Sequence, residues 1–273
     1  MTRMNALRMG QSLPLLKKVQ VNIPFPMLLK NLEMVLEVGF QPEIYFHSQV
    51  LDHLQMEDVR KASQKLVERN TSVTFHAPFM DLNPGAVDEK IREITSYRFN
   101  QVLDLVPFFH PRMIVFHPGY DRFRYDDNVD LWLENSLRTW KPLLERVQNA
   151  ASRSVRMAVE NVFEEHPSIL KRLLSAIDSP FLGYCLDAGH GQLFSGVEMG
   201  EWVEVLGPWL LEMHLHDNHG KADEHLPVGQ GKIDFAGIFA RLKSKHLNPI
   251  YTVEPHQQEH LEPTLKGLEK DLS

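Results

Sequence analysis

The sequence predicts an α/β protein that forms a single (β/α)8 TIM barrel, and three observations support this prediction. Segments with the character of buried strands alternate eight times with segments of helical periodicity. Such alternation is typical of parallel sheets with helical crossovers, and eight units in about 250 residues fit a closed barrel better than an open sheet. No glycine-rich dinucleotide motif follows the first strand, and no linker or repeat divides the chain. We therefore expect one domain over residues 1–273, with residues 1–14 as a loose leader.

The first half of the chain contains four predicted strand–helix units. Strands are expected at 18–23, where polar and apolar residues alternate, and at 42–47, 72–76 and 112–117, which are mostly apolar runs that end in histidine. Helices are expected at 27–38, 57–69, 88–106 and 129–151, where apolar residues recur at helical spacing. Pro24 and Pro26 should end the first strand, Gly39 should end the first helix, and Asn70 should cap the second.

The second half contains four more units. Strands are expected at 155–160, 181–187, 210–214 and 249–254, and helices at 167–177, 198–206, 234–245 and 260–272. Cys185 lies between apolar neighbours of the sixth strand, which predicts a buried position rather than a nucleophile. It is the only cysteine, so no internal disulfide can form, and a reducing cytoplasmic location is expected.

Composition narrows the classes of function. The chain is 43% hydrophobic and 24% charged, with a net charge of −7, so no global electrostatic attraction to nucleic acid or to an acidic membrane is expected. The sequence contains no recognisable signal peptide and no apolar stretch of membrane-spanning length. We therefore expect no membrane partner.

Side chains that can bind a metal end six consecutive predicted strands. In barrels of this class the active site is built at the carboxyl ends of the strands. The six strand-end residues are His76, His117, Glu160, Asp187, His214 and Glu254. Three more candidates follow strand ends closely, and these are His190, Asp223 and His225. A single polar residue at a strand end is usually structural, but six in succession predict a site for a divalent metal such as zinc or manganese.

The densest of these segments is 213–231, which follows the seventh strand. Asp223 and His225 would point the same way if this loop were extended, because side chains alternate along an extended backbone. Gly229 and Gly231 are expected to let the backbone turn before the next helix begins. Taken alone, the segment could also be a solvated polar loop with incidental histidines.

Short motifs run in a fixed order from the third strand to the eighth. They are FHAP at 75–78, FHPG at 116–119, EN at 160–161, LDAGH at 186–190, HLHD at 214–217, DEH at 223–225, GQG at 229–231 and VEP at 253–255. Each motif is weak alone, but the ordered set resembles the xylose isomerase-like TIM barrels. That superfamily joins sugar-phosphate isomerases and epimerases to endonuclease IV-type AP endonucleases, so the resemblance specifies the superfamily and not the reaction.

The resemblance implies two uses of the site. In the isomerases and epimerases, one divalent metal is held at the positions of Glu160, Asp187, His214 and Glu254, and the two glutamates also move protons on the sugar. In the endonucleases, three zinc ions use all nine positions named above. This sequence keeps all nine, which favours more than one metal, and multi-metal sites suit cleavage of phosphate esters. The implied cofactor is one to three divalent ions, zinc or manganese.

The loops favour the sugar enzymes. A DNA-binding rim needs Lys and Arg to contact phosphates, yet residues 47–56 and 77–88 contain none. Phe79 stands where endonuclease IV has a tyrosine. Against the epimerases, the arginine that they place soon after the strand-seven histidine is missing, and Gly220 and Lys221 stand nearby.

We therefore expect a metal-dependent isomerase or epimerase of a small sugar or sugar phosphate. Glu160 and Glu254 are the expected catalytic acid and base. His190, Asn161 and Phe79 are expected to contact the substrate. An endonuclease IV-like zinc phosphodiesterase (an AP endonuclease) is the alternative, and a non-catalytic metal- or sugar-binding barrel is a second alternative. Nucleic acid is not the expected partner.

Overall fold

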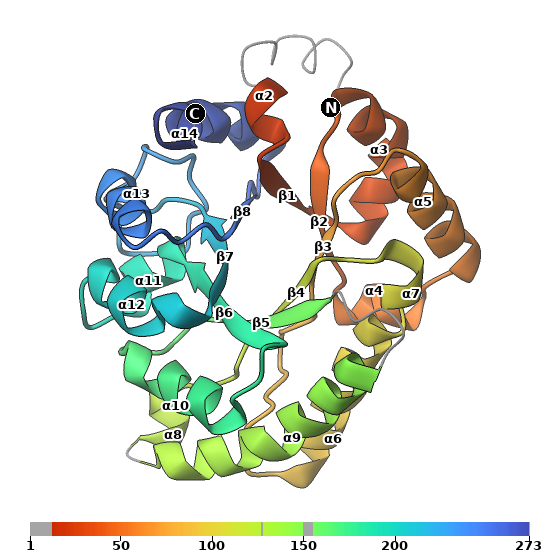
Figure 1. Ribbon diagram of the computed structural model, residues 1–273. Helices are drawn as coiled ribbons and strands as arrows, with labels where there is room; N and C mark the ends of the chain where they lie inside the picture. Colours follow the sequence, from red (N-terminus) through yellow and green to blue (C-terminus); the bar gives the residue numbers. More distant parts are fainter. Residues whose placement is uncertain (1–12, 127, 150–154, 273) are drawn as a thin grey trace.

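Eight parallel strands form a closed barrel, which confirms the predicted fold class (Figure 1). The computed structural model describes residues 13–126, 128–149 and 155–272. Each strand pairs in parallel with the next along the chain, and the eighth pairs with the first. The strands are β1 Val19–Pro24, β2 Gln41–Tyr45, β3 Thr74–His76, β4 Met113–Phe116, β5 Arg156–Glu160, β6 Leu182–Asp187, β7 Leu210–Leu215 and β8 Ile250–Val253.

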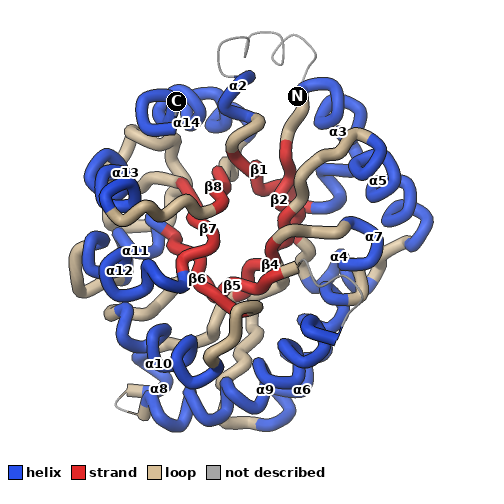
Figure 2. The backbone as a smooth tube through the Cα atoms, in the orientation of Figure 1, coloured by secondary structure: helices blue, strands red, loops and turns tan. Residues whose placement is uncertain are grey.

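Helices surround the barrel as an outer ring (Figure 2). The eight predicted helices are all present as α3 Phe25–Val38, α5 Met56–Glu68, α6 Glu89–Leu103, α9 Val129–Asn149, α10 Pro167–Ile177, α12 Met199–Leu206, α13 Phe235–Ser244 and α14 Leu261–Leu272. None of the helices in the described ranges combines the length and the apolar character needed to cross a bilayer.

The sheet has an apolar layer on each of its two faces. Phe116 of β4 packs against Phe99 of α6 and Trp140 of α9, so this side chain faces the helices. Its neighbour Val115 belongs to a separate small cluster with Cys185. Because side chains alternate along a strand, this cluster faces the barrel interior and fills it below the carboxyl ends of the strands. Cys185 is fully buried, as predicted. The upper interior is therefore free for polar side chains.

Proline explains two boundaries that the sequence misplaced. Pro24 was expected to break the first strand, but it is the last residue of β1 and pairs with Tyr45 of β2. The helix expected at 88–106 is instead α6 followed by α7 Val106–Phe109, because Pro107 lacks an N–H and occupies the first turn of a new helix. Gly39 ends α3 with φ 82°, as expected.

The predicted leader and the predicted ends of two helices differ from the structure or fall partly outside the described residues. Residues 13 and 14 of the expected loose leader belong to the short helix α2 Leu13–Leu16, and residues 1–12 lie outside the described ranges. Residues 150 and 151 of the helix expected at 129–151 also lie outside them. Asn70 does not continue α5, and its φ of 50° places it in the left-handed region just beyond the helix.

Short helices in the loops after strands were not predicted. They are α4 Ser48–Asp52, α8 Arg122–Tyr125 and α11 Ala188–Phe194, and two 3-10 turns, η1 Gly207–Trp209 and η2 Gln258–His260, occur elsewhere. The helix α11 matters most, because it begins directly at the end of β6. Asp187 caps it by accepting a hydrogen bond from the backbone N–H of His190 at 2.6 Å. This cap turns the His190 side chain back toward the strand ends.

Candidate metal centre

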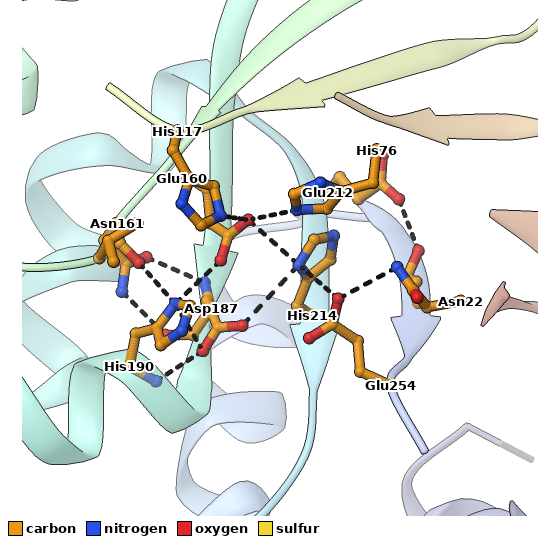
Figure 3. A network of polar contacts seen from close by, with 12 residues as sticks. Asn22, His76, His117, Glu160, Asn161, Asp187, His190, Glu212, His214 and Glu254 are labelled. Atoms are coloured by element: carbon orange, nitrogen blue, oxygen red, sulfur yellow. Dashed lines mark hydrogen bonds and ion pairs between the residues drawn. The ribbon is translucent and has the colours of Figure 1, made fainter. Parts of the chain in front are cut away.

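Glu160 lies at the centre of a cluster of imidazoles at the carboxyl ends of the strands (Figure 3). Its Oε2 atom is 3.2 Å from Nε2 of His76, 3.4 Å from Nε2 of His117 and 3.4 Å from Nδ1 of His214. Its Oε1 atom is 2.9 Å from Nδ1 of His190. Strands β3, β5 and β7 and the loops after β4 and β6 therefore bring five predicted ligands together.

Asp187 and Glu254 complete this group from β6 and from the end of β8. The Oδ2 atom of Asp187 lies 3.8 Å from Nδ1 of His214, and Oε1 of Glu254 lies 3.3 Å from the same nitrogen. Both carboxylates also approach His216, whose Nε2 is 3.1 Å from Asp187 and 3.8 Å from Glu254. Together with Glu160, three carboxylates thus converge on the His214 imidazole.

Asp223 and His225 join the cluster at its outer side. Oδ2 of Asp223 is 3.1 Å from Nε2 of His225 and 3.6 Å from Nε2 of His190, and its Oδ1 is 3.5 Å from Nδ1 of His216. The two side chains meet as predicted, although the loop is not extended, because His225 has a φ of 45°. All nine predicted ligand residues therefore lie in one connected network.

The donor set fits a divalent ion. Neither ring nitrogen of the buried His214 has a hydrogen-bond partner among the described residues, although carboxylates surround the ring. Several triplets of candidate ligand atoms lie within 4.8 Å of one another, a span close to that bridged by two metal–ligand bonds of about 2.0–2.2 Å. Two of these triplets are His76–His117–Glu160 and His216–Asp223–His225. Converging carboxylates repel one another, so a cation stabilises the arrangement.

The ionised carboxylates of the cluster attract a cation, which must compete with protons for the imidazoles. Burial raises the pKa of the Glu160 carboxyl, but the imidazoles of His117 and His214 outweigh burial and hold the pKa well below its usual value. Burial likewise raises the pKa of Asp187, and His190 and His216 lower it further than burial raises it. Burial lowers the pKa of His214, but Cys185, Glu254 and Glu43 raise it above its usual value. The carboxylates of Glu160 and Asp187 are therefore ionised, and a cation that binds them displaces protons from the imidazoles.

His216 belongs to the candidate site, although it was not among the nine predicted ligands. It is 1% exposed, and its Nε2 contacts both oxygens of Asp187 at 3.1 Å. The sequence contained the signal, because residues two apart on a strand face the same side, so His216 follows His214 into the barrel. His256, also set aside, stacks on His225 with ring centroids 3.4 Å apart and lines the cavity.

Asn161 does not face a substrate. Its Oδ1 accepts hydrogen bonds from the backbone N–H of Asp187 at 2.9 Å and from the Tyr184 hydroxyl at 2.5 Å, and its Nδ2 donates to the backbone carbonyl of Asp187. The residue is 1% exposed, so its amide is not free for a substrate hydroxyl. The sequence predicted that Asn161 contacts the substrate, whereas these contacts fit a residue that orients Asp187.

Two buried carboxyls below the cluster were missed in the sequence. Oε2 of Glu43, on β2, lies 3.4 Å from Nε2 of His214, and its Oε1 accepts a hydrogen bond from Asn22 at 2.8 Å. Burial and the neighbouring Glu43 raise the pKa of Glu212, on β7, well above its usual value. Both glutamates are 0% exposed. Their strands were predicted from apolar runs. The available signal was strand alternation, because Glu43 faces the same side as Tyr45, and Glu212 faces the same side as His214.

Replacing Glu43 with glutamine is expected to weaken metal binding about 10- to 100-fold. The negative charge beside Nε2 of His214 favours the proton on that nitrogen, which leaves the Nδ1 lone pair facing the three carboxylates and the metal. Glutamine keeps the volume and removes the charge. Calorimetric titration of the apoprotein with zinc measures the affinity, and the exposed Glu57→Gln serves as the control. Equal affinities for wild type and Glu43→Gln would contradict this positioning role.

A glycine beside the cluster allows His216 to approach. A Cβ atom on Gly189 would lie 1.9 Å from Cε1 of His216, far inside contact distance. We expect Gly189→Ala to displace the ring and to lower zinc affinity, as measured by the same titration. Gly196→Ala is the matched control, because a Cβ there meets its nearest atom at 3.6 Å, an ordinary contact. Unchanged zinc affinity in Gly189→Ala would show that zinc binding does not require the close approach of His216 to this glycine.

A cavity of about 470 Å³ opens above the cluster. Glu160, Glu254, His190 and other cluster residues form its floor, and Phe79 forms part of its wall. The Phe79 ring stacks on His117 at a centroid distance of 4.3 Å and an angle of 17°. His47, at the end of the predicted second strand, caps α4 by accepting a hydrogen bond from the N–H of Val50.

The sequence resembles known proteins. The family model described as "Xylose isomerase-like TIM barrel" matches residues 36–272. The uncharacterized protein MJ1311 of Methanocaldococcus jannaschii is 30% identical over 189 residues, which cover 67% of this chain and 64% of that protein. The match therefore spans less than two thirds of the length of this relative.

Solved structures show the same fold. A D-tagatose 3-epimerase-like protein has a TM-score of 0.75 at 24% identity, with 92% of this chain and 96% of that chain covered. The TTHB071 protein from Thermus thermophilus, soaked with ZnCl2, has a TM-score of 0.72 at 26% identity and coverages of 93% and 97%. Endonuclease IV from the same organism has a TM-score of 0.65 at 19% identity, with coverages of 93% and 98%. The neighbours thus include both branches that the sequence motifs indicated.

The family match spans most of the chain, and the closed parallel barrel with polar residues at its carboxyl end agrees with it. This protein belongs to the xylose isomerase-like TIM barrel family.

Proposed function

We propose that this protein is a divalent-metal-dependent isomerase or epimerase that acts on a small sugar or sugar phosphate. The placement of Glu160 and Glu254 carries the proposal. Their carboxylates come from β5 and from the end of β8, approach the same nitrogen of His214 at 3.4 and 3.3 Å, and line one cavity. Two carboxylates that reach a pocket from different strands can remove a proton from one side of a carbon and return one from the other.

A bound divalent ion supplies Lewis-acid polarisation of the carbonyl and the adjacent hydroxyl of the sugar. The glutamates differ in access to the substrate. The Glu254 side chain is 11% exposed, whereas the Glu160 side chain is 1% exposed and enclosed by imidazoles. We therefore assign proton removal to Glu254. Glu160 is ionised, so it returns a proton that it first takes from a neighbouring imidazole such as His190, whose Nδ1 is 2.9 Å from its Oε1.

The remaining predicted residues have supporting roles in this proposal. His190 lines the cavity and contacts Glu160 and Asp223, so it can bind a metal or a sugar hydroxyl. Phe79 has one ring face against His117 and lines the cavity, where it can pack against the substrate. Asn161 acts as a positioning residue for Asp187 through its bonds to the backbone of that residue.

A zinc phosphodiesterase is the second candidate, because the chain keeps all nine ligand residues in one network. The electrostatics of the pocket oppose it. Arg124 is the only Lys or Arg among the described residues that line the cavity, while Asp81 and Asp121 add negative charge to the same wall. Contact with a DNA backbone requires several cations along the rim. We therefore rank this activity below sugar isomerisation.

Hydrogen exchange distinguishes the candidates. The protein, reconstituted with zinc or with manganese, is incubated in heavy water with a panel of ketoses and sugar phosphates, and NMR detects deuterium at the reacting carbon. A duplex with one abasic site is tested in parallel. Deuterium incorporation supports the isomerase. Zinc-dependent nicking without exchange supports the phosphodiesterase, and sugar binding without either reaction supports a binding protein.

A further inference from the structure

The N–H groups of the glycine-rich turn after β7, which could hold a phosphate, are already occupied. In (β/α)8 barrels a phosphate is frequently held by the loops after the last two strands. Here the carboxylate of Asp217 accepts hydrogen bonds from the N–H groups of Gly229 at 3.0 Å, Gly231 at 2.9 Å and Ile233 at 3.1 Å. Asp217 is 0% exposed. An anion of this chain therefore fills the glycine-rich turn, and a substrate phosphate would compete with it for these donors.

Side chains do not supply a phosphate site either. Within the described part of the cavity lining, Arg124 is the single Lys or Arg, and its Nε lies 3.4 Å from Oδ2 of Asp121. Asp81 lines the same cavity. Phosphate recognition relies on several cations or a bidentate arginine, and this wall offers one arginine that is already paired. The cavity therefore favours a substrate without a phosphate group.

Another part of the cavity lining is apolar. Met80 follows β3, Phe163 follows β5, and Phe194 ends α11, and all three line the cavity. We call these three residues the apolar rim. They are 68%, 45% and 38% exposed, respectively. The rings of Phe163 and Phe194 meet edge to face at 4.9 Å and 74°, so they form a preformed surface.

The rim continues directly from the metal cluster. The Phe194 ring lies 6.3 Å from the ring of His190, one of the candidate ligands. The whole cavity, about 470 Å³, lies within the range of pockets that enclose drug-sized ligands and offers more room than one sugar ring needs. A sugar at the metal cluster can therefore carry a substituent that reaches the rim.

We propose that the substrate is an unphosphorylated keto-sugar with an apolar or planar substituent, such as an aryl glycoside whose ketone lies at a ring carbon other than the anomeric carbon. This inference rests on the proposed function, since it places the keto-sugar between Glu160 and Glu254. The substituent packs on Phe163 and Phe194, because exposed aromatic rings lose water when an apolar or planar group covers them. The rim thus selects the glycosidic partner, and the cluster selects the keto-sugar.

Matched ligands test the proposal. The zinc- or manganese-loaded full chain is titrated calorimetrically with three derivatives of one hexose whose ketone lies at a ring carbon other than the anomeric carbon. These are the methyl glycoside, the phenyl glycoside and the 6-phosphate of the methyl glycoside. We expect the phenyl glycoside to bind about ten-fold more tightly than the methyl glycoside, as one covered aromatic pair would give. The phosphate should bind more weakly than its parent. Tighter binding of the phosphate, or equal binding of both glycosides, overturns the proposal.

Variants locate the preference. Phe163→Ala should reduce the phenyl-to-methyl affinity ratio to near one, with metal content confirmed for each preparation. Phe123→Ala should keep the ratio, because Phe123 is 85% exposed and is not among the residues that line the cavity. An unchanged ratio in Phe163→Ala would contradict the proposal that the apolar rim binds the substituent. The exchange assay with ketoses reports on the proposed function separately: exchange with no phenyl preference rejects the rim alone, and no binding or exchange with any sugar rejects both.

Discussion

Glu254→Gln is expected to abolish substrate hydrogen exchange, with a loss of at least about 100-fold. Glutamine has nearly the volume of glutamate and can still accept the hydrogen bond from Asn22 at Oε1, but it cannot take up a proton. NMR detection of deuterium at the reacting carbon, at saturating metal, measures the loss. Saturation matters, because Glu254 also approaches Nδ1 of His214 at 3.3 Å and is a candidate ligand.

The control for this variant is Glu259→Gln, which lies in the loop after the same strand and is exposed. It should exchange like wild type. Circular dichroism and metal content establish that Glu254→Gln is folded and loaded. Exchange at the wild-type rate in a loaded Glu254→Gln protein would remove Glu254 from the reaction and leave Glu160 as the base to test next.

Asp187→Ala is expected to lose the metal. Asp187 is 0% exposed and contacts His190, His214 and His216, so its removal opens the coordination sphere and leaves three imidazoles without this carboxylate. Elemental analysis of protein purified without chelator measures metal content. Melting with and without added zinc gives a second readout, because an ion that binds only the folded state raises the melting temperature.

Asp187→Asn separates the two roles of this residue. Asparagine can still accept the hydrogen bond from the N–H of His190 and cap α11, whereas alanine cannot. Both variants should lose metal, but alanine should cost an additional ~1 kcal/mol of stability in the apoprotein. A fully loaded Asp187→Asn protein would contradict the assignment of Asp187 as a ligand. Equal apoprotein stabilities would contradict its role as the helix cap.

Hydrophobic periodicity was sufficient for the fold. A run such as 155–160 is too apolar for a surface strand, and the amphipathic segment that follows it at 167–177 covers one face of the sheet. The errors fall at prolines and at loops. Pro24 belongs to β1 and pairs with Tyr45 of β2, because its missing N–H does not remove every ladder bond. The helix α11 formed where no helix was predicted.

The convergence of the nine candidate ligand residues was also readable from the chain, because a parallel barrel brings the carboxyl ends of all its strands to one face. Residues as distant in sequence as His76 and Glu254 therefore had to be neighbours, and a ligand atom of each lies within the same 4.8 Å group. Only the predicted strand boundaries and the order of the strands along the chain were needed to select the nine candidate residues. Their chemistry followed from side-chain type alone.

Other features required the packed molecule. The depth of a polar residue within the barrel depends on register, so the contact of Glu43 with His214 could not be read from two separate strands. Asn161 follows the candidate ligand Glu160 in the sequence, yet its amide forms hydrogen bonds with the backbone of Asp187 at the end of β6. Asp217 occupies the N–H groups of the turn at Gly229 and Gly231 because the loop folds back on the end of β7. Strand periodicity and residue type are local properties, so the sequence by itself determines them. The partners of a buried polar group depend on which segments meet, so only the folded barrel decides them.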